Sequence, residues 1–97
     1  MTRADVLAII AAHRDELREL GVRRLALFGS IVRDEGQVGS DLDFLVELDP
    51  KTFDSYMDVK FYLESLFGLP VDLVLTETLK PALREVVLRE AVHAAEL

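Results

Sequence analysis

A chain of 97 residues, 51% hydrophobic and 30% charged, has the composition of a globular protein and predicts one small domain over residues 1–97. The absence of cysteine excludes disulfides, thiolate zinc sites and thiol nucleophiles. A formal net charge of -7 argues against direct nucleic-acid binding, because neutralising phosphates needs clustered Lys and Arg; the charge fits a basic protein partner, and equally a small domain that is merely kept soluble.

The distribution of apolar residues predicts neither a membrane span nor an export signal. No stretch approaches the roughly 18 uninterrupted apolar residues of a membrane span. The N-terminus carries an amphipathic pattern, without a basic region followed by a purely apolar one. We therefore expect a cytoplasmic protein with no membrane contact.

The first predicted element is an amphipathic helix over residues 2–20. Thr2 is its predicted N-cap and Gly21 its C-cap. His13 lies on the apolar stripe and is expected to be partly buried and hydrogen-bonded, not a ligand. The apolar positions on either side of it recur at helical spacing: Val6, Ile10, Leu17 and Leu20.

Two strands with a glycine turn between them are predicted next. Residues 22–28 are rich in Val, Leu and Phe, which favours a buried or half-buried strand. Gly29 and Ser30 end this strand, and the stretch to Ser40 predicts one helical turn followed by a loop. Residues 41–48 predict a second strand, in which strand alternation places four side chains on one face: Asp41, Asp43, Leu45 and Glu47.

The rest of the chain alternates helix and strand. Residues 52–67 have a broad apolar face at helical spacing, and Gly68 and Pro70 end that helix. A short strand over 71–75 and a last helix over 79–95, with Pro81 in its first turn, complete the chain. The order predicts an α/β (α+β) fold class, a small mixed β-sheet covered by helices.

The acidic face of the second strand predicts metal chemistry. Asp41 and Asp43, separated by one residue on a strand, project from the same face roughly 6 to 7 Å apart, close enough to share a pair of Mg²⁺ ions. Such ion pairs support nucleotidyl transfer. Asp72, between apolar Val71 and Leu73, is predicted to face away from the core, complete the metal site and accept the proton of an attacking hydroxyl.

The glycine turn predicts phosphate binding. Gly29 lets the backbone approach a phosphate closely, and Ser30 offers its N–H and hydroxyl at the start of a helical turn, where the helix dipole favours an anion. Arg33, one turn further on, adds a positive charge. Either feature alone is weak, since Gly-Ser occurs in many turns and Asp-x-Asp on a strand edge is often only a solvated face.

Together, these motifs resemble those of a known family. Gly29-Ser30, ten residues and then Asp41-Leu42-Asp43 have the spacing of the polymerase-β-like nucleotidyltransferases. The surrounding sequence, from Leu-Phe-Gly-Ser through Ser40 to Val46 and on to Pro-Val-Asp-Leu-Val around Asp72, resembles the minimal nucleotidyltransferases over nearly the whole chain. The resemblance implies the polymerase-β-like nucleotidyltransferase fold.

The resemblance also implies an activity and a partner. It implies a transferase that uses ATP, with Asp41 and Asp43 binding two Mg²⁺ ions and Asp72 assisting the acceptor hydroxyl. The Gly-Ser pair would hold the triphosphate, with Arg33 and Ser40 as further phosphate-binding candidates. Many members of the family act as antitoxins that transfer AMP to a tyrosine of a HEPN-domain ribonuclease toxin, so the expected partner is such a toxin.

Two other functions stay open at this point. The chain would also fit a non-catalytic antitoxin that covers a basic ribonuclease, with which its acidic charge is equally compatible. Transfer to a small molecule such as an aminoglycoside is the weaker alternative, because enzymes of that kind usually add a domain to enclose the acceptor.

Overall fold

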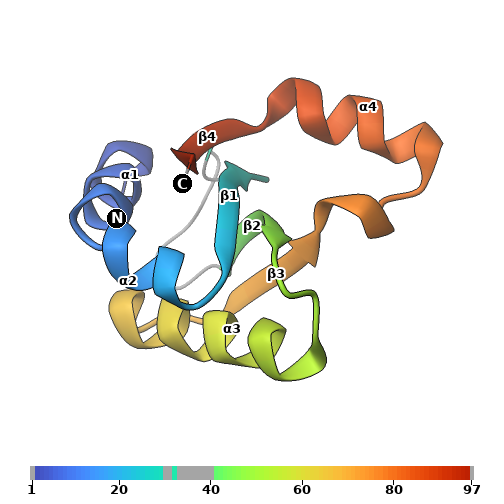
Figure 1. Cartoon of the computed structure of the whole chain (residues 1–97). Helices are drawn as coiled ribbons and strands as arrows, with labels where there is room; N and C mark the ends of the chain where they lie inside the picture. Colours follow the sequence, from blue (N-terminus) through green and yellow to red (C-terminus); the bar gives the residue numbers. More distant parts are fainter. Residues whose placement is uncertain (1, 30–31, 33–40, 97) are drawn as a thin grey trace.

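The computed structural model contains one four-stranded sheet in the order β3-β2-β1-β4, with helices around it (Figure 1). The structure describes residues 2–29, 32 and 41–96, without the side chains of 93–96. In chain order the elements are α1 Arg3–Ala12, α2 Arg14–Glu19, β1 Val22–Phe28, β2 Leu42–Leu48, α3 Phe53–Phe67, β3 Val71–Leu75, the 3-10 turn η1 Thr76–Thr78, α4 Pro81–Glu90 and β4 Val92–Glu96.

The sheet is mixed, as predicted. β1 pairs antiparallel with both β2 and β4, whereas β2 pairs parallel with β3. A parallel pair needs a crossover connection, and α3 supplies it between β2 and β3. The predicted fold class, a small mixed sheet covered by helices, is confirmed.

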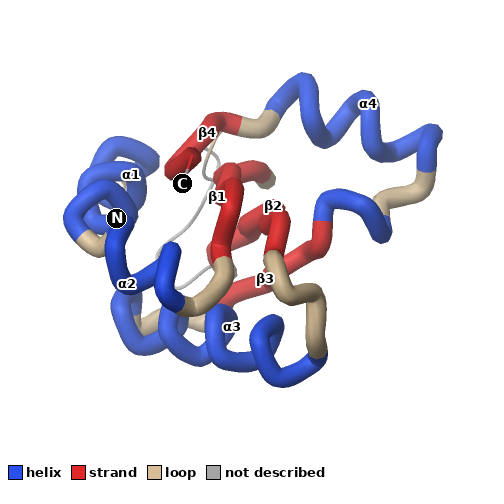
Figure 2. Tube along the Cα trace, viewed as in Figure 1, coloured by secondary structure: helices blue, strands red, loops and turns tan. Residues whose placement is uncertain are grey.

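The core lies on one face of the sheet. Helices α1, α2 and α3 cover this face, while α4 runs along the other side (Figures 1 and 2). Each covering helix contributes side chains to one apolar cluster with the strands, which includes Val6, Ile10, Leu17, Leu25, Leu27, Phe44, Val46, Val59, Leu63, Phe67, Val71 and Leu73. The opposite face of the sheet carries the aspartates Asp43 and Asp72.

Helix α3 has a capping residue at each end, Thr52 and Gly68. The Thr52 hydroxyl accepts a hydrogen bond from the N–H of Ser55 at 3.1 Å, which satisfies a free donor of the first turn. Gly68 ends the helix in a left-handed conformation, with φ 65°. No helix of the described residues is long and apolar enough to cross a membrane.

The predicted single helix over residues 2–20 is wrong in one respect, because it is broken at His13. The N–H of His13 donates to the carbonyl of Ile10 at 3.0 Å, and its Nδ1 lies 2.8 Å from the carbonyl oxygen of Ile9. These contacts satisfy carbonyl groups at the end of α1, and α2 starts with the next residue. His13 is half-buried, with its ring edge toward Tyr62, so its predicted structural role is confirmed.

Thr2 caps α1 as predicted, and Asp5 completes the cap. The Thr2 hydroxyl accepts from the N–H of Asp5 at 3.2 Å, and the Asp5 carboxylate accepts from the N–H of Thr2 at 3.0 Å. The hydrogen bonds to the backbone and then to the side chain of Thr2 lower the pKa of Asp5.

This lowered pKa predicts how the stability of α1 depends on pH. Because the folded-state pKa lies below the unfolded value, the contribution of Asp5 is fully present above pH about 4 and is lost as the pH falls through the folded pKa. Asp5→Asn should therefore destabilise the chain at pH 6 and have a smaller effect at pH 3. Urea unfolding of both proteins at the two pH values measures this, and an equal difference at both would contradict it.

The predicted last helix over 79–95 is also wrong in its second half. Helix α4 ends at Glu90, Ala91 is extended, and Val92–Glu96 forms β4 against β1. The Ala-rich sequence favours helix locally, but the open edge of β1 offers backbone hydrogen bonds to an extended segment, and tertiary pairing overrides propensity. β4 thus pairs with the edge of β1 that β2 leaves open.

Candidate active site

The strand register brings two of the predicted aspartates together. Asp43 is the second residue of β2 and Asp72 the second residue of β3, and they are direct partners in the parallel pairing. Neighbouring strands lie about 4.8 Å apart, so the two side chains start from adjacent backbone positions. Asp41 lies directly before β2, at the same end of the sheet.

Two of the three aspartates lie within strands, where alternation with buried neighbours places them on the face away from the core. Asp72 is exposed and Asp43 is half-buried, whereas Leu42 and Phe44 on either side of Asp43 are buried. Asp41 is exposed and precedes β2, so its place on a shared face stays a prediction. Partial burial of Asp43 strengthens its interactions with any charge at the site, because less water screens them.

Leu45 departs from the polar character of this face. Its relative exposure is 2%, yet it does not belong to the core cluster on the other side of the sheet. In the register it lies between Ala26 of β1 and Val74 of β3. The face of the sheet that carries the aspartates is therefore acidic only at that end and apolar in its middle.

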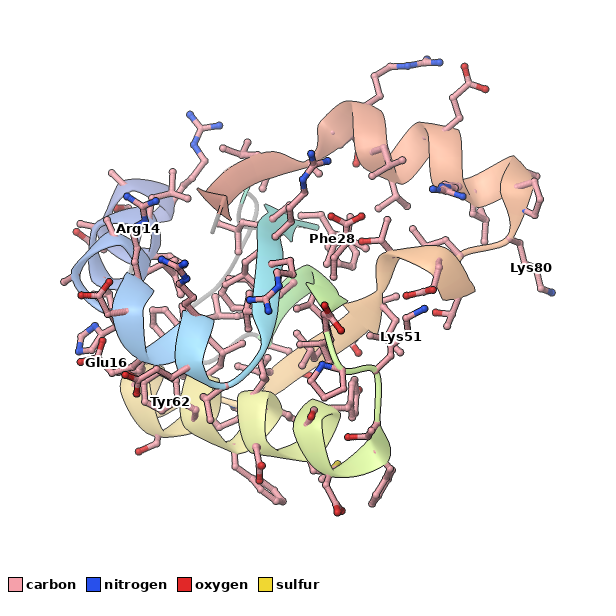
Figure 3. The ribbon with its side chains drawn as sticks, in the orientation of Figure 1. Arg14, Glu16, Phe28, Lys51, Tyr62 and Lys80 are labelled. Atoms are coloured by element: carbon pink, nitrogen blue, oxygen red, sulfur yellow. The ribbon has the colours of Figure 1, made fainter. Side chains whose placement is uncertain are left out.

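The Gly29 turn lies directly against Asp43. Phe28, the last residue of β1, pairs with Asp43 across the antiparallel strands and lies on the α4 side of the sheet (Figure 3). Gly29 follows with φ 85°, a left-handed conformation. A Cβ at this position would overlap Oδ2 of Asp43 and lie 3.0 Å from its Cγ. Only glycine fits both the backbone conformation and the space left by the carboxylate.

Two contacts hold the turn after Gly29. The N–H of Val32 donates to the Gly29 carbonyl at 3.2 Å, closing a tight turn. The Arg3 guanidinium of α1 donates to the Val32 carbonyl at 3.3 Å. The remaining predicted phosphate-binding residues lie outside the described residues: Ser30, Arg33 and Ser40.

The carboxylates suit a Mg²⁺ ion by their chemistry. Within residues 2–29, 32 and 41–96, no group of three or more His, Cys, Asp or Glu side chains is placed to hold a metal. Mg²⁺ is commonly bound through one or two carboxylates together with substrate phosphates and water. Adjacent Asp43 and Asp72 provide such a pair on neighbouring strands, so the donor set fits the ion.

A separate hollow of about 310 Å³ lies elsewhere. It is lined by Lys51, Thr52, Phe53, Tyr56 and Leu75. These residues follow the carboxyl end of β2 or belong to the carboxyl end of β3 and the start of α3, whereas the aspartates lie at the opposite ends of both strands. This hollow is therefore not part of the carboxylate site.

Two contacts at β3 were not indicated by the sequence. The Glu64 carboxylate accepts a hydrogen bond from the N–H of Val71 at 3.0 Å. The Tyr56 hydroxyl donates to the carbonyl of Leu73 at 2.5 Å. Helical spacing explains why these side chains face the sheet, but no pattern in the sequence says which backbone atoms they bind.

Comparisons of the sequence with known proteins agree with this geometry. Residues 10–93 match the nucleotidyltransferase domain family. The protein adenylyltransferase MntA of Thermococcus cleftensis is 41% identical over 95 residues, which cover 96% of both chains. The matched region includes Gly29 and all three aspartates.

Comparisons of the structure give the same fold. A solved structure assigned as a minimal nucleotidyltransferase superposes with a TM-score of 0.81 at 38% identity, covering 95% of both chains. A toxin–antitoxin structure with AMP-PNP matches with a TM-score of 0.73 at 20% identity, over 91% of this chain and 73% of the other. A tri-AMPylated HEPN toxin of Shewanella oneidensis in complex with its MNT antitoxin matches with a TM-score of 0.65 at 18% identity, over 94% and 73%.

Proposed function

The chain belongs to the nucleotidyltransferase domain family, and from this premise we propose that it is a protein adenylyltransferase, an antitoxin that transfers AMP from ATP to a tyrosine of a cognate HEPN toxin. The pairing of Asp43 with Asp72, next to the Gly29 turn, is the observation that carries the proposal. We propose that residues 1–97 act as one domain, since the family match and the single sheet extend over most of them.

The glycine turn binds the triphosphate. Gly29 has no side chain, so a phosphate can approach the backbone next to Asp43. Ser30, Arg33 and Ser40 complete the phosphate contacts through N–H, hydroxyl and guanidinium donors. These residues orient the α-phosphorus toward the acceptor on the carboxylate face.

The aspartates would bind the metal ions and accept the proton of the tyrosine hydroxyl. Asp41, Asp43 and Asp72 would hold two Mg²⁺ ions, whose positive charge stabilises the charge that develops on the phosphate oxygens. Asp72, exposed at the start of β3, accepts the proton of the attacking tyrosine hydroxyl. The tyrosine oxygen forms a bond to the α-phosphorus, the bond from that phosphorus to the oxygen bridging to the β-phosphate breaks, and pyrophosphate leaves.

The partner is supported by the relatives and by charge. Structures that share this fold include antitoxins bound to HEPN toxins, and the net charge of -7 favours association with a basic protein surface. An enzyme is released after each transfer, whereas an antitoxin that only binds the toxin stays on it. Covalent modification therefore distinguishes the proposed function from inhibition by binding alone.

Turnover is the direct test. The chain, in substoichiometric amount, is incubated with labelled ATP, Mg²⁺ and the cognate HEPN toxin, and the intact mass of the toxin is measured. We expect more moles of AMP on tyrosine than moles of chain added. Protection of RNA only at stoichiometric amounts, without added AMP mass, would instead identify a binding antitoxin.

A further inference from the structure

The free edge of β3 is occupied by side chains from α3. β3 is the terminal strand of the sheet and pairs only with β2 among the described strands. The N–H of Leu42 donates to the Pro70 carbonyl at 3.1 Å, so this carbonyl points toward β2. In a planar trans peptide the following N–H points the opposite way. The N–H of Val71 therefore points away from β2, toward the outer edge of the sheet, where none of the described strands can accept its hydrogen bond.

Glu64 and Tyr56 satisfy this edge on both sides of Asp72. Glu64 binds the N–H of Val71 at 3.0 Å, and Tyr56 binds the carbonyl of Leu73, the next outward-pointing residue, at 2.5 Å. Both hydrogen bonds are partly buried, which limits competition from water. The two residues that flank Asp72 are thus each fixed to α3, a helix anchored in the core by Val59 and Leu63.

We infer that Glu64 and Tyr56 are positioning residues, which fix the backbone of β3 so that the Asp72 carboxylate stays beside Asp43. The inference rests on the proposed function, in which Asp72 accepts the proton. The start of β3 depends on Glu64 in particular, since Pro70 before it has no N–H to bind. Hydrogen bonds to a carboxylate acceptor are stronger than those to a neutral acceptor.

The first measurement is hydrogen exchange of the chain without nucleotide, followed by NMR. In Glu64→Ala we expect the amides of Val71 and Asp72 to exchange at least about tenfold faster, because the hydrogen bond that holds the start of β3 to α3 is lost. Core amides of α3 should change less than about twofold. Glu64→Gln, whose amide oxygen still accepts, should restore slow exchange. Asp58→Ala, which removes an exposed carboxylate from the same helix, is the matched control.

The second measurement is AMP transfer at a temperature where all variants are folded. Glu64→Ala and Tyr56→Phe should each lower kcat about tenfold with KM for ATP unchanged within about twofold, since misplacing Asp72 affects the chemical step. Faster exchange with unaltered kcat would overturn the positioning role and leave only edge protection. Unaltered exchange would overturn the inference even if the parent enzyme is active, whereas a parent chain without AMP transfer would overturn the proposed function instead.

Discussion

Asp43→Asn, alone or combined with Asp41→Asn, is expected to lower AMP transfer at least about a thousandfold, or about 4 kcal/mol of transition-state stabilisation. The amide keeps the size of the side chain but removes the negative charge that holds a cation. Asp43 is the partly buried member of the site and the neighbour of both Asp72 and Gly29. Its charge is therefore the least screened of the three.

Glu47→Gln is the matched control for this substitution. Glu47 lies on β2 four residues after Asp43, on the same face, and pairs with Arg24 at 3.4 Å. Glu47→Gln removes the same negative charge away from the proposed site. Partly exposed ion pairs contribute little to stability, so the rate of AMP transfer should stay within about twofold of the parent rate. Circular dichroism checks folding. Full transfer by folded Asp41→Asn/Asp43→Asn protein would refute the assignment of the site.

Gly29→Ala is expected to abolish most of the activity and to destabilise the chain. The left-handed backbone at φ 85° costs an alanine about 1 to 2 kcal/mol. Its Cβ would also displace the Asp43 carboxylate, which lies in the space that it would fill. A displacement of about 1 Å can lower a rate about a hundredfold. Initial rates of AMP transfer and urea unfolding measure the two effects separately.

Gly68→Ala separates backbone strain from the effect on Asp43. Gly68 also has a left-handed conformation, with φ 65°, but a Cβ there would meet no atom within 4 Å. This variant should lose about 1 kcal/mol of stability through strain and keep its transfer rate when folded. Equal losses of activity in the two variants would show that Gly29 matters only for the backbone and does not make room for Asp43.

Some of the site was predictable because its signals are local. Alternation along β2 indicated that Asp43 faces away from the core, and the apolar neighbours of Asp72 indicated the same for that residue. The cap at Thr2 was likewise predictable from residue type and position. Each of these features depends on residues only a few positions apart.

The predictions were wrong where contacts between distant segments determine the conformation. The first helix is broken where His13 forms hydrogen bonds with the last carbonyl groups of α1. The last segment is a strand because it pairs with the edge of β1. The burial of Leu45, on the face that carries the acids, follows from its neighbours in the sheet. Local propensity contains none of these interactions.

Residues close together in the chain specify most of the helices and strands up to β3, the order of the Gly-Ser turn and the aspartates, and the family to which they belong, because hydrophobic periodicity and turn residues act over short distances. Only the tertiary structure decided that Asp72 stands beside Asp43, that Gly29 makes room for the Asp43 carboxylate, and that α3 holds the strand of Asp72. Strand register and side-chain contacts between distant segments arise from packing of the whole domain, which no stretch of sequence specifies alone.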